Sequence, residues 1–183
     1  MTTSQIALGT VCGALSCLLT GPPTAPVPPA VERLTPCQAD VARAVAEQLA
    51  RAPRGRFTPP DTLSYDGGAE VITFRPPSCG PARRGAEDDC DEDGVPGNAV
   101  CLYDRRAFEG SRQAIKVPGP RRLSGTGLFM SLRNDRPFVF LVKRSRDDGG
   151  TCFPGGARSG NLRGVADQRW VNAHPSLRAC PSL

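Results

Sequence analysis

The amino-acid sequence predicts a mainly β fold with one helix before it. The chain has 183 residues, of which 20 are Gly and 19 are Pro, and their recurrence after Pro53 interrupts long helices. From Ala99 onward, the short apolar runs AVCLY, AIKV, GLFMSL, FVFLV and RWVN are separated by Gly, Pro, Asn and Asp, as in a small sandwich or barrel. No apolar run reaches the ~18 residues of a membrane-spanning helix, so we expect no membrane span.

Residues 1–30 have the pattern of a secretory signal peptide with a Pro-rich exit. Ile6 to Leu19 carry no charge, and a Pro-rich stretch follows from Pro22 to Pro29, which is typical of the apolar region of such a peptide and the segment after it. We therefore predict that the protein is secreted and extracellular. A buried helix or lipidation at Cys17 is the alternative interpretation.

Removal of Cys12 and Cys17 with the signal peptide would leave six of the 8 cysteines. An even number in an oxidising compartment predicts three disulfides, although many pairings are open. We predict pairing in chain order, so that each bond closes one local unit: Cys37 with Cys79, Cys90 with Cys101, and Cys152 with Cys180. No C-x-x-C spacing occurs and His174 is the only histidine, so a zinc site or a thiol-redox motif has little support and we expect no cofactor.

Residues 31–75 predict a small helix plus β-hairpin unit. Thr35, Pro36 and Gln38 form a capping-box start for a helix that continues to about Ala52. Apolar residues recur at every fourth position of this helix: Val41, Val45 and Leu49. The sequence Pro-Arg-Gly at residues 53–55 ends it.

The hairpin follows after a short connection. Leu63 to Tyr65 and Ala69 to Phe74 flank Asp66-Gly67-Gly68, where Gly supplies the positive φ that a tight turn needs. Residues 76–98 are rich in Pro, Gly and charge, and we interpret them as a linker or long loop. Residues 99–183 are the predicted β-domain.

A weak internal repeat predicts two related sheets in this domain. Phe129 to Arg133 recurs as His174 to Arg178, with Ser, Leu and Arg at the same places. Two duplicated sheets of about 40 residues each would account for this spacing.

Tyr103, Phe108 and Gly110 carry a resemblance to a known fold. An aromatic residue, four residues, a second aromatic, one residue and Gly match the Greek-key signature of βγ-crystallins. The Gly can adopt a backbone conformation closed to other residues where the first hairpin folds over, and the aromatic side chain lies over that hairpin. A later Ser hydrogen-bonds across the hairpin, for which Ser131 is the candidate in the first motif and Ser176 in the second.

The segment from Val100 to Gly110, followed by a Ser-Leu-Arg-Asn strand, is similar to the secreted actinobacterial proteins grouped as peptidase inhibitor family thirty-six. The resemblance implies a βγ-crystallin-like Greek-key sandwich and the inhibition of a metalloprotease. The second motif departs from the pattern, because Val142 to Gly149 has the spacing of the first aromatic to the Gly but lacks the aromatic.

These observations predict a disulfide-braced, monomeric peptidase inhibitor that acts by stoichiometric binding to a secreted protease. Rigid loops held by disulfides can enter a protease cleft with little ordering cost. The candidates are two strongly charged loops, Asp104 to Ala107 and Lys143 to Gly150. The alternative is a non-inhibitory exported β-domain that binds cell-wall or other extracellular partners.

A calcium loop is a weaker candidate. Asp89, Asp91 and Asp93 lie at alternate positions before Gly94, as at the start of such a loop. The twelfth position counted from Asp89 is Val100, where a bidentate Glu would close the loop. We therefore favour a solvated acidic linker and predict no metal.

Catalysis and specific nucleic-acid binding have less support. The sequence lacks G-x-S-x-G, phosphate-cradling and HExxH motifs, and the lone His174 precedes Pro175, so we expect no enzyme. Basic residues cluster at Arg105-Arg106, Arg121-Arg122 and Lys143 to Arg146. Because aromatics are not interleaved with them, we interpret these clusters as solvated basic faces and expect no specific nucleic acid partner.

Overall fold

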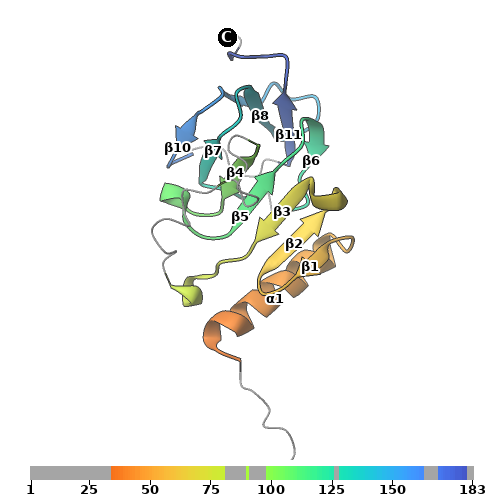
Figure 1. Ribbon diagram of the computed structural model, residues 1–183, viewed down its shortest axis with the longest axis vertical. Coiled ribbons are helices and arrows are strands. Elements are labelled where there is room, and N and C mark those ends of the chain that lie inside the picture. Colours follow the sequence, from red (N-terminus) through yellow and green to blue (C-terminus); the bar gives the residue numbers. More distant parts are fainter. Residues whose placement is uncertain (1–33, 81–89, 91–97, 126–127, 163–168, 181–183) are drawn as a thin grey trace, which may run out of the picture. The chain divides into compact units, whose positions relative to one another are not determined.

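The computed structural model describes residues 34–80, 90, 98–125, 128–162 and 169–180. Over these residues the chain is mainly β, with two antiparallel sheets and one α-helix (Figure 1). The elements are α1 (Pro36–Arg51), β1 (Arg56–Thr58), β2 (Thr62–Tyr65), η1 (Asp66–Gly68), β3 (Glu70–Thr73), η2 (Pro77–Cys79), β4 (Val100–Tyr103), η3 (Arg106–Phe108), β5 (Arg112–Ile115), β6 (Gly119–Arg122), β7 (Ser131–Asn134), β8 (Val139–Lys143), β9 (Thr151–Phe153), β10 (Arg158–Ser159) and β11 (Trp170–His174). Within the described ranges, no helix has the length and apolar character needed to cross a membrane. The predicted signal peptide lies outside them.

Helix α1 forms as its sequence predicts. The Thr35 hydroxyl accepts a hydrogen bond from the Gln38 backbone N–H at 3.2 Å, and the Gln38 side chain accepts one from the Thr35 N–H at 2.8 Å. Such a cap stabilises a helix by about 1 kcal/mol. Val41 and Val45 are buried and pack in a cluster with Ile72 of β3. The helix is therefore fixed to the hairpin by its apolar face.

Strands β2 and β3 form the predicted hairpin. Asp66, Gly67 and Gly68 connect them with positive φ values of 50°, 67° and 94°. Strand β1, which the sequence pattern did not predict, is exposed and pairs with β2. On the other side, β3 pairs with β5. The hairpin and the later strands therefore belong to one continuous sheet.

The two sheets share one strand arrangement. Their orders are β1-β2-β3-β5-β4-β7-β10 and β6-β11-β8-β9. Strands β4–β7 and β8–β11 form two groups of four. In each group the fourth strand (β7 or β11) pairs with the first (β4 or β8), and the third strand (β6 or β10) joins the other sheet. The order β5-β4-β7-β10 is thus repeated as β9-β8-β11-β6.

This structural repeat differs from the one predicted in the sequence. Strand β7 begins at Ser131, but Ser176 and Arg178 follow the end of β11 at His174. The prediction that Phe129–Arg133 and His174–Arg178 are equivalent is therefore wrong. Three shared residues do not specify a strand register, which depends on which face each side chain buries.

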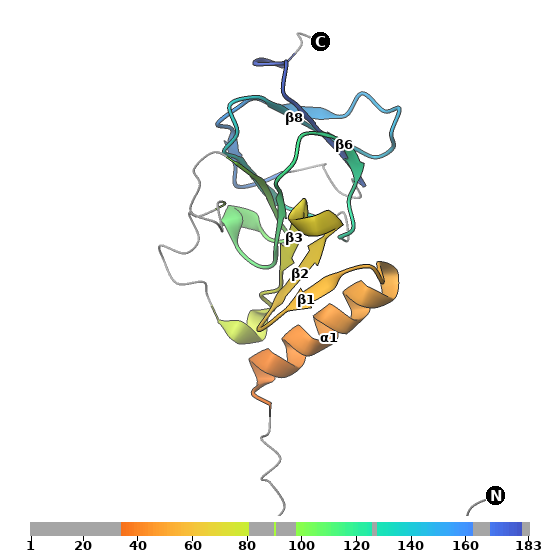
Figure 2. The same cartoon turned by 45° about the vertical axis from the view of Figure 1, so that its right-hand side comes forward.

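Alternate residues of β4 face two different clusters. Val100 and Leu102 lie in the core between the sheets, with Leu132 and Phe140, while Tyr103 belongs to a cluster on the opposite face. Through the pairing of β3 with β5 and of β5 with β4, Ile72 shares the face of Leu102. Helix α1 and the four-stranded sheet therefore cover different parts of the same face of the larger sheet (Figure 2).

Three disulfides join the cysteines in the predicted chain order: Cys37–Cys79, Cys90–Cys101 and Cys152–Cys180. The first connects α1 to η2, the second reaches β4, and the third connects β9 to the residues after β11. Intramolecular disulfides of this kind are typical of extracellular proteins.

Candidate functional site

The connection between β4 and β5 has an unusual backbone. Ala107, Phe108 and Gly110 have positive φ values of 56°, 62° and 83°, a region that costs a residue with a side chain roughly 1–2 kcal/mol. A Cβ atom at Gly110 would lie 1.9 Å from the Asp104 carboxylate. Gly110 therefore supplies the conformation expected of it, and a larger residue would require the Asp104 side chain to move.

Ser131 holds this connection across the hairpin. Its side chain is fully buried, and its Oγ accepts a hydrogen bond from the Phe108 N–H at 3.0 Å and donates one to the Arg105 carbonyl at 2.6 Å. Tyr103 is also buried and meets the Phe108 ring edge-on, with 5.8 Å between centroids. The residues predicted for the first motif thus come together in one place.

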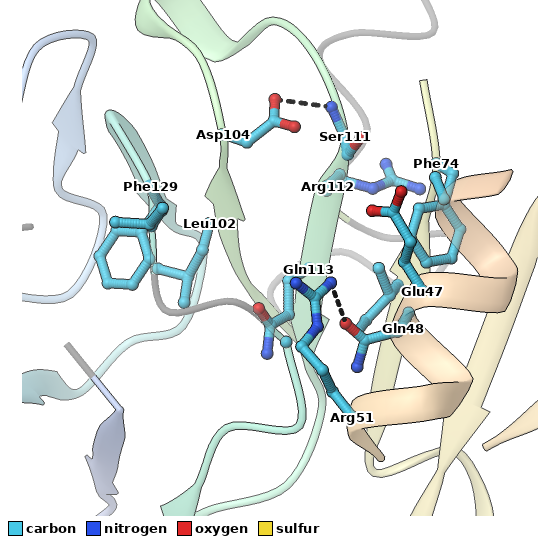
Figure 3. A pocket seen from close by; sticks show the side chains of 14 residues that line it. Glu47, Gln48, Arg51, Phe74, Leu102, Asp104, Ser111, Arg112, Gln113 and Phe129 are labelled. Atoms are coloured by element: carbon cyan, nitrogen blue, oxygen red, sulfur yellow. Dashed lines mark hydrogen bonds between the residues drawn. The ribbon is translucent and has the colours of Figure 1, made fainter. Parts of the chain in front are cut away.

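A small pocket of about 230 Å³ lies beside this hairpin, between α1 and β5. Figure 3 shows the carboxylates of Asp104 and Glu47 and the guanidinium groups of Arg51 and Arg112 around it. The Asp104 carboxylate accepts a hydrogen bond from the Ser111 N–H at 2.9 Å. Partial burial raises the pKa of Asp104, although this bond acts to lower it. Ligand sites usually have volumes of about 300 Å³ or more, so this pocket is smaller than most of them.

A buried polar cluster next to the pocket was not predicted. The Glu70 carboxylate accepts hydrogen bonds from the Gln113 side chain at 2.5 Å and from the Ser124 N–H at 2.8 Å. Gln48 of α1 donates to the Ser124 carbonyl at 2.5 Å and to the Tyr65 hydroxyl at 3.2 Å. The Ser124 peptide groups are therefore held on both sides. Burial of Glu70 raises the pKa of its carboxyl group.

The second predicted loop connects β8 and β9, and residues 144–150 are all exposed. The Asp148 carboxylate accepts hydrogen bonds from the N–H groups of Arg144 and Gly150, both at 3.4 Å. The Cys152–Cys180 disulfide lies just beyond the loop. The left-handed glycine here is Gly150, with φ 73°, rather than the Gly149 that the motif spacing predicted.

Ser176 does not occupy the place predicted for it. It is exposed after the end of β11, and its Oγ lies 3.1 Å from His174 Nδ1. Trp170 pairs with Lys143 in the second unit, at the position where Ser131 pairs with Tyr103 in the first unit. The second unit therefore lacks a serine at the position equivalent to Ser131, because a different residue begins its fourth strand.

The candidate calcium ligands Asp89, Asp91 and Asp93 lie outside the described residues. Cys90 between them is buried in its disulfide, and Val100 at the twelfth position is buried in β4. Among the residues that the structure describes, no three His, Cys, Asp or Glu side chains are grouped to hold a metal ion.

No protein-family model, curated protein or solved structure matches the chain. Two charged segments are anchored to the fold. The β4–β5 connection is held by hydrogen bonds to Ser131, and the loop of residues 144–150 lies next to a disulfide.

Proposed function

We propose that this chain is a secreted inhibitor of a protease, with a βγ-crystallin-like double Greek key related to peptidase inhibitor family thirty-six. Two features support the fold: the fourth strand of each unit returns beside the first, as in a Greek key, and Ser131 bridges the hairpin of Tyr103 and Gly110. The apolar pattern of residues 1–30 and the three disulfides support export.

The observation that carries the inhibitory function is the loop of residues 144–150. It is exposed along its whole length, yet Val142 pairs with Thr151 at its base, and Cys152 is crosslinked one residue further on. A loop that is already ordered loses little conformational entropy when it enters a cleft. Arg144 and Arg146 provide long side chains that can fill subsites of a bound protease.

The β4–β5 connection is the weaker candidate for protease contact. Its polar groups are already engaged within the fold, since Asp104 accepts from Ser111 and the Arg105 carbonyl accepts from Ser131. A partner would have to compete with these bonds. We therefore assign the contact to residues 144–150.

A stoichiometric titration tests this proposal. Purified protein is added at micromolar concentration to secreted metalloproteases and, in parallel, to secreted serine proteases. We expect inhibition of a metalloprotease that is complete at one inhibitor per enzyme. The double variant Arg144→Ala, Arg146→Ala should inhibit at least tenfold more weakly, a loss of about 1.4 kcal/mol in binding free energy.

The matched control is Arg43→Ala, Arg158→Ala, which removes the same charge from exposed positions on α1 and β10. It should inhibit as the unaltered protein does. Absence of inhibition across the panel, or an equal loss in both double variants, would contradict the assignment.

A further inference from the structure

A second, larger depression lies beside the C-terminal end of α1. It has a volume of about 830 Å³, within the range of sites that hold small ligands. Five arginines line it: Arg51, Arg54, Arg121, Arg122 and Arg169. Among the described lining residues, Asp66 is the only acidic one. We call this depression the arginine groove.

The fold gathers these arginines from three separate parts of the chain. Arg51 ends α1, Arg54 lies in the turn after it, Arg121 and Arg122 are in β6, and Arg169 precedes β11. The pairing of β6 with β11 fixes one side, and the Leu123 N–H donates to the Arg169 carbonyl at 2.8 Å. Bringing like charges together opposes folding, so an anion in the groove would relieve their repulsion.

Two carboxylates, those of Glu70 and Asp66, lie near the Arg121 guanidinium. The Arg121 Nη1 and the Glu70 Oε2 are both buried, and neither makes a hydrogen bond among the described residues. The Arg121 Nη2 lies 3.9 Å from the Asp66 carboxylate, beyond hydrogen-bond distance. The Arg121 side chain is 17% exposed, so Arg121 contributes to the positive charge of the groove more than to direct contact with a ligand.

We propose that the arginine groove binds a ligand that carries two or more phosphoryl groups. A guanidinium group is a planar fork that donates two parallel hydrogen bonds to a phosphate. The summed charge of five arginines around 830 Å³ suits several linked phosphates better than one small anion. Leu128, which is exposed, adds apolar surface for the rest of the ligand. The groove shares no lining residue with residues 144–150, so this binding is separate from protease inhibition.

Calorimetry with inorganic tripolyphosphate tests the proposal on the full chain. We expect saturable binding of one tripolyphosphate per chain, weakening as salt is raised. The double variant Arg54→Ala, Arg122→Ala removes two exposed groove arginines and should bind at least tenfold more weakly. Arg43→Ala, Arg158→Ala removes the same charge elsewhere and should change the affinity less than twofold. The melting temperatures of both variants check that they remain folded.

Equal weakening in the two double variants would show attraction by net charge alone and would overturn the proposal, as would the absence of saturable binding at millimolar tripolyphosphate. Citrate binding as tight as tripolyphosphate binding would contradict the preference for phosphoryl groups. Two further ligands distinguish the natural source: tighter binding of a nucleoside triphosphate than of a glycerol phosphate oligomer indicates a nucleotide, and the reverse order indicates a phosphodiester polymer.

Discussion

Replacing Ser131 with Ala should remove the side chain that holds the β4–β5 connection. The change deletes the acceptor for the Phe108 N–H and the donor to the Arg105 carbonyl. Each partly buried group left without a partner costs about 1–2 kcal/mol, so the free energy of unfolding should fall by about 2–4 kcal/mol. The positive φ values of Ala107 and Phe108 add to the effect, because Ser131 helps to maintain that strained backbone.

Urea unfolding at intact disulfides measures this loss. Trp170 is the only tryptophan and lies in β11 of the four-stranded sheet, so its fluorescence reports unfolding away from the altered site. A loss of ~3 kcal/mol lowers the midpoint by about 1.5 M urea for a slope near 2 kcal/mol/M. Ser176→Ala is the control, because Ser176 is exposed and should change stability by less than about 0.5 kcal/mol. The reasoning is refuted if Ser131→Ala is no more destabilising than this control.

Three further changes test other parts of the fold. Gly110→Ala should lower the free energy of unfolding by about 2 kcal/mol in urea titration, because φ is 83° and the new Cβ meets Asp104; an unchanged midpoint would contradict this. Burial raises the pKa of Glu70, so the folded state retains its proton above pH 4.5 and stability should fall as pH rises through the folded pKa. Glu70→Gln should flatten this pH dependence in thermal melts between pH 4.5 and 7.5, and an unchanged slope would count against it. Loss of the Cys37–Cys79 disulfide through serine substitutions should cost about 4 kcal/mol, because it closes a 42-residue loop; melting within a few degrees of the unaltered protein would argue otherwise.

The local part of the fold could be predicted because its signals lie close together in the sequence. The capping box of Thr35 and Gln38 and the Asp-Gly-Gly turn each involve residues within four positions of one another. The pairing of cysteines in chain order was also predicted, since each disulfide closes a local unit. In the helix cap and the turn, local geometry determines the structure.

Strands β6 and β10, each of which joins the sheet of the other group, could not be predicted from the apolar pattern of the sequence. Strand β6 has the sequence Gly-Pro-Arg-Arg and is only partly buried, and β10 has two residues with little buried surface. Each is a strand because its neighbour, β11 or β7, offers free backbone groups. The pairing strand is far away in the sequence, so the formation of β6 and β10 depends on the tertiary fold.

Part of the candidate site could likewise be predicted from the sequence, and part of it could not. The spacing of Tyr103, Phe108 and Gly110 predicted the first hairpin, and Ser131 was found through the same motif. Glu70 gave no comparable signal, although strand alternation with Ile72 places it on the covered face. The arginine groove was also missed, because its arginines come from three separate parts of the chain.

No disulfide joins the helix–hairpin unit to the later strands, because each of the three disulfides closes within its own part of the chain. Apart from the backbone, their connection is noncovalent. It rests on the pairing of β3 with β5 and on the bonds of Gln48 and Glu70 to Ser124. The same junction positions Arg51 and Arg54 opposite Arg121 and Arg122. A phosphoryl ligand in the arginine groove would therefore bind across this junction and stabilise the folded state in proportion to its occupancy. Stability and ligand binding are thus coupled at a boundary that none of the three disulfides crosses.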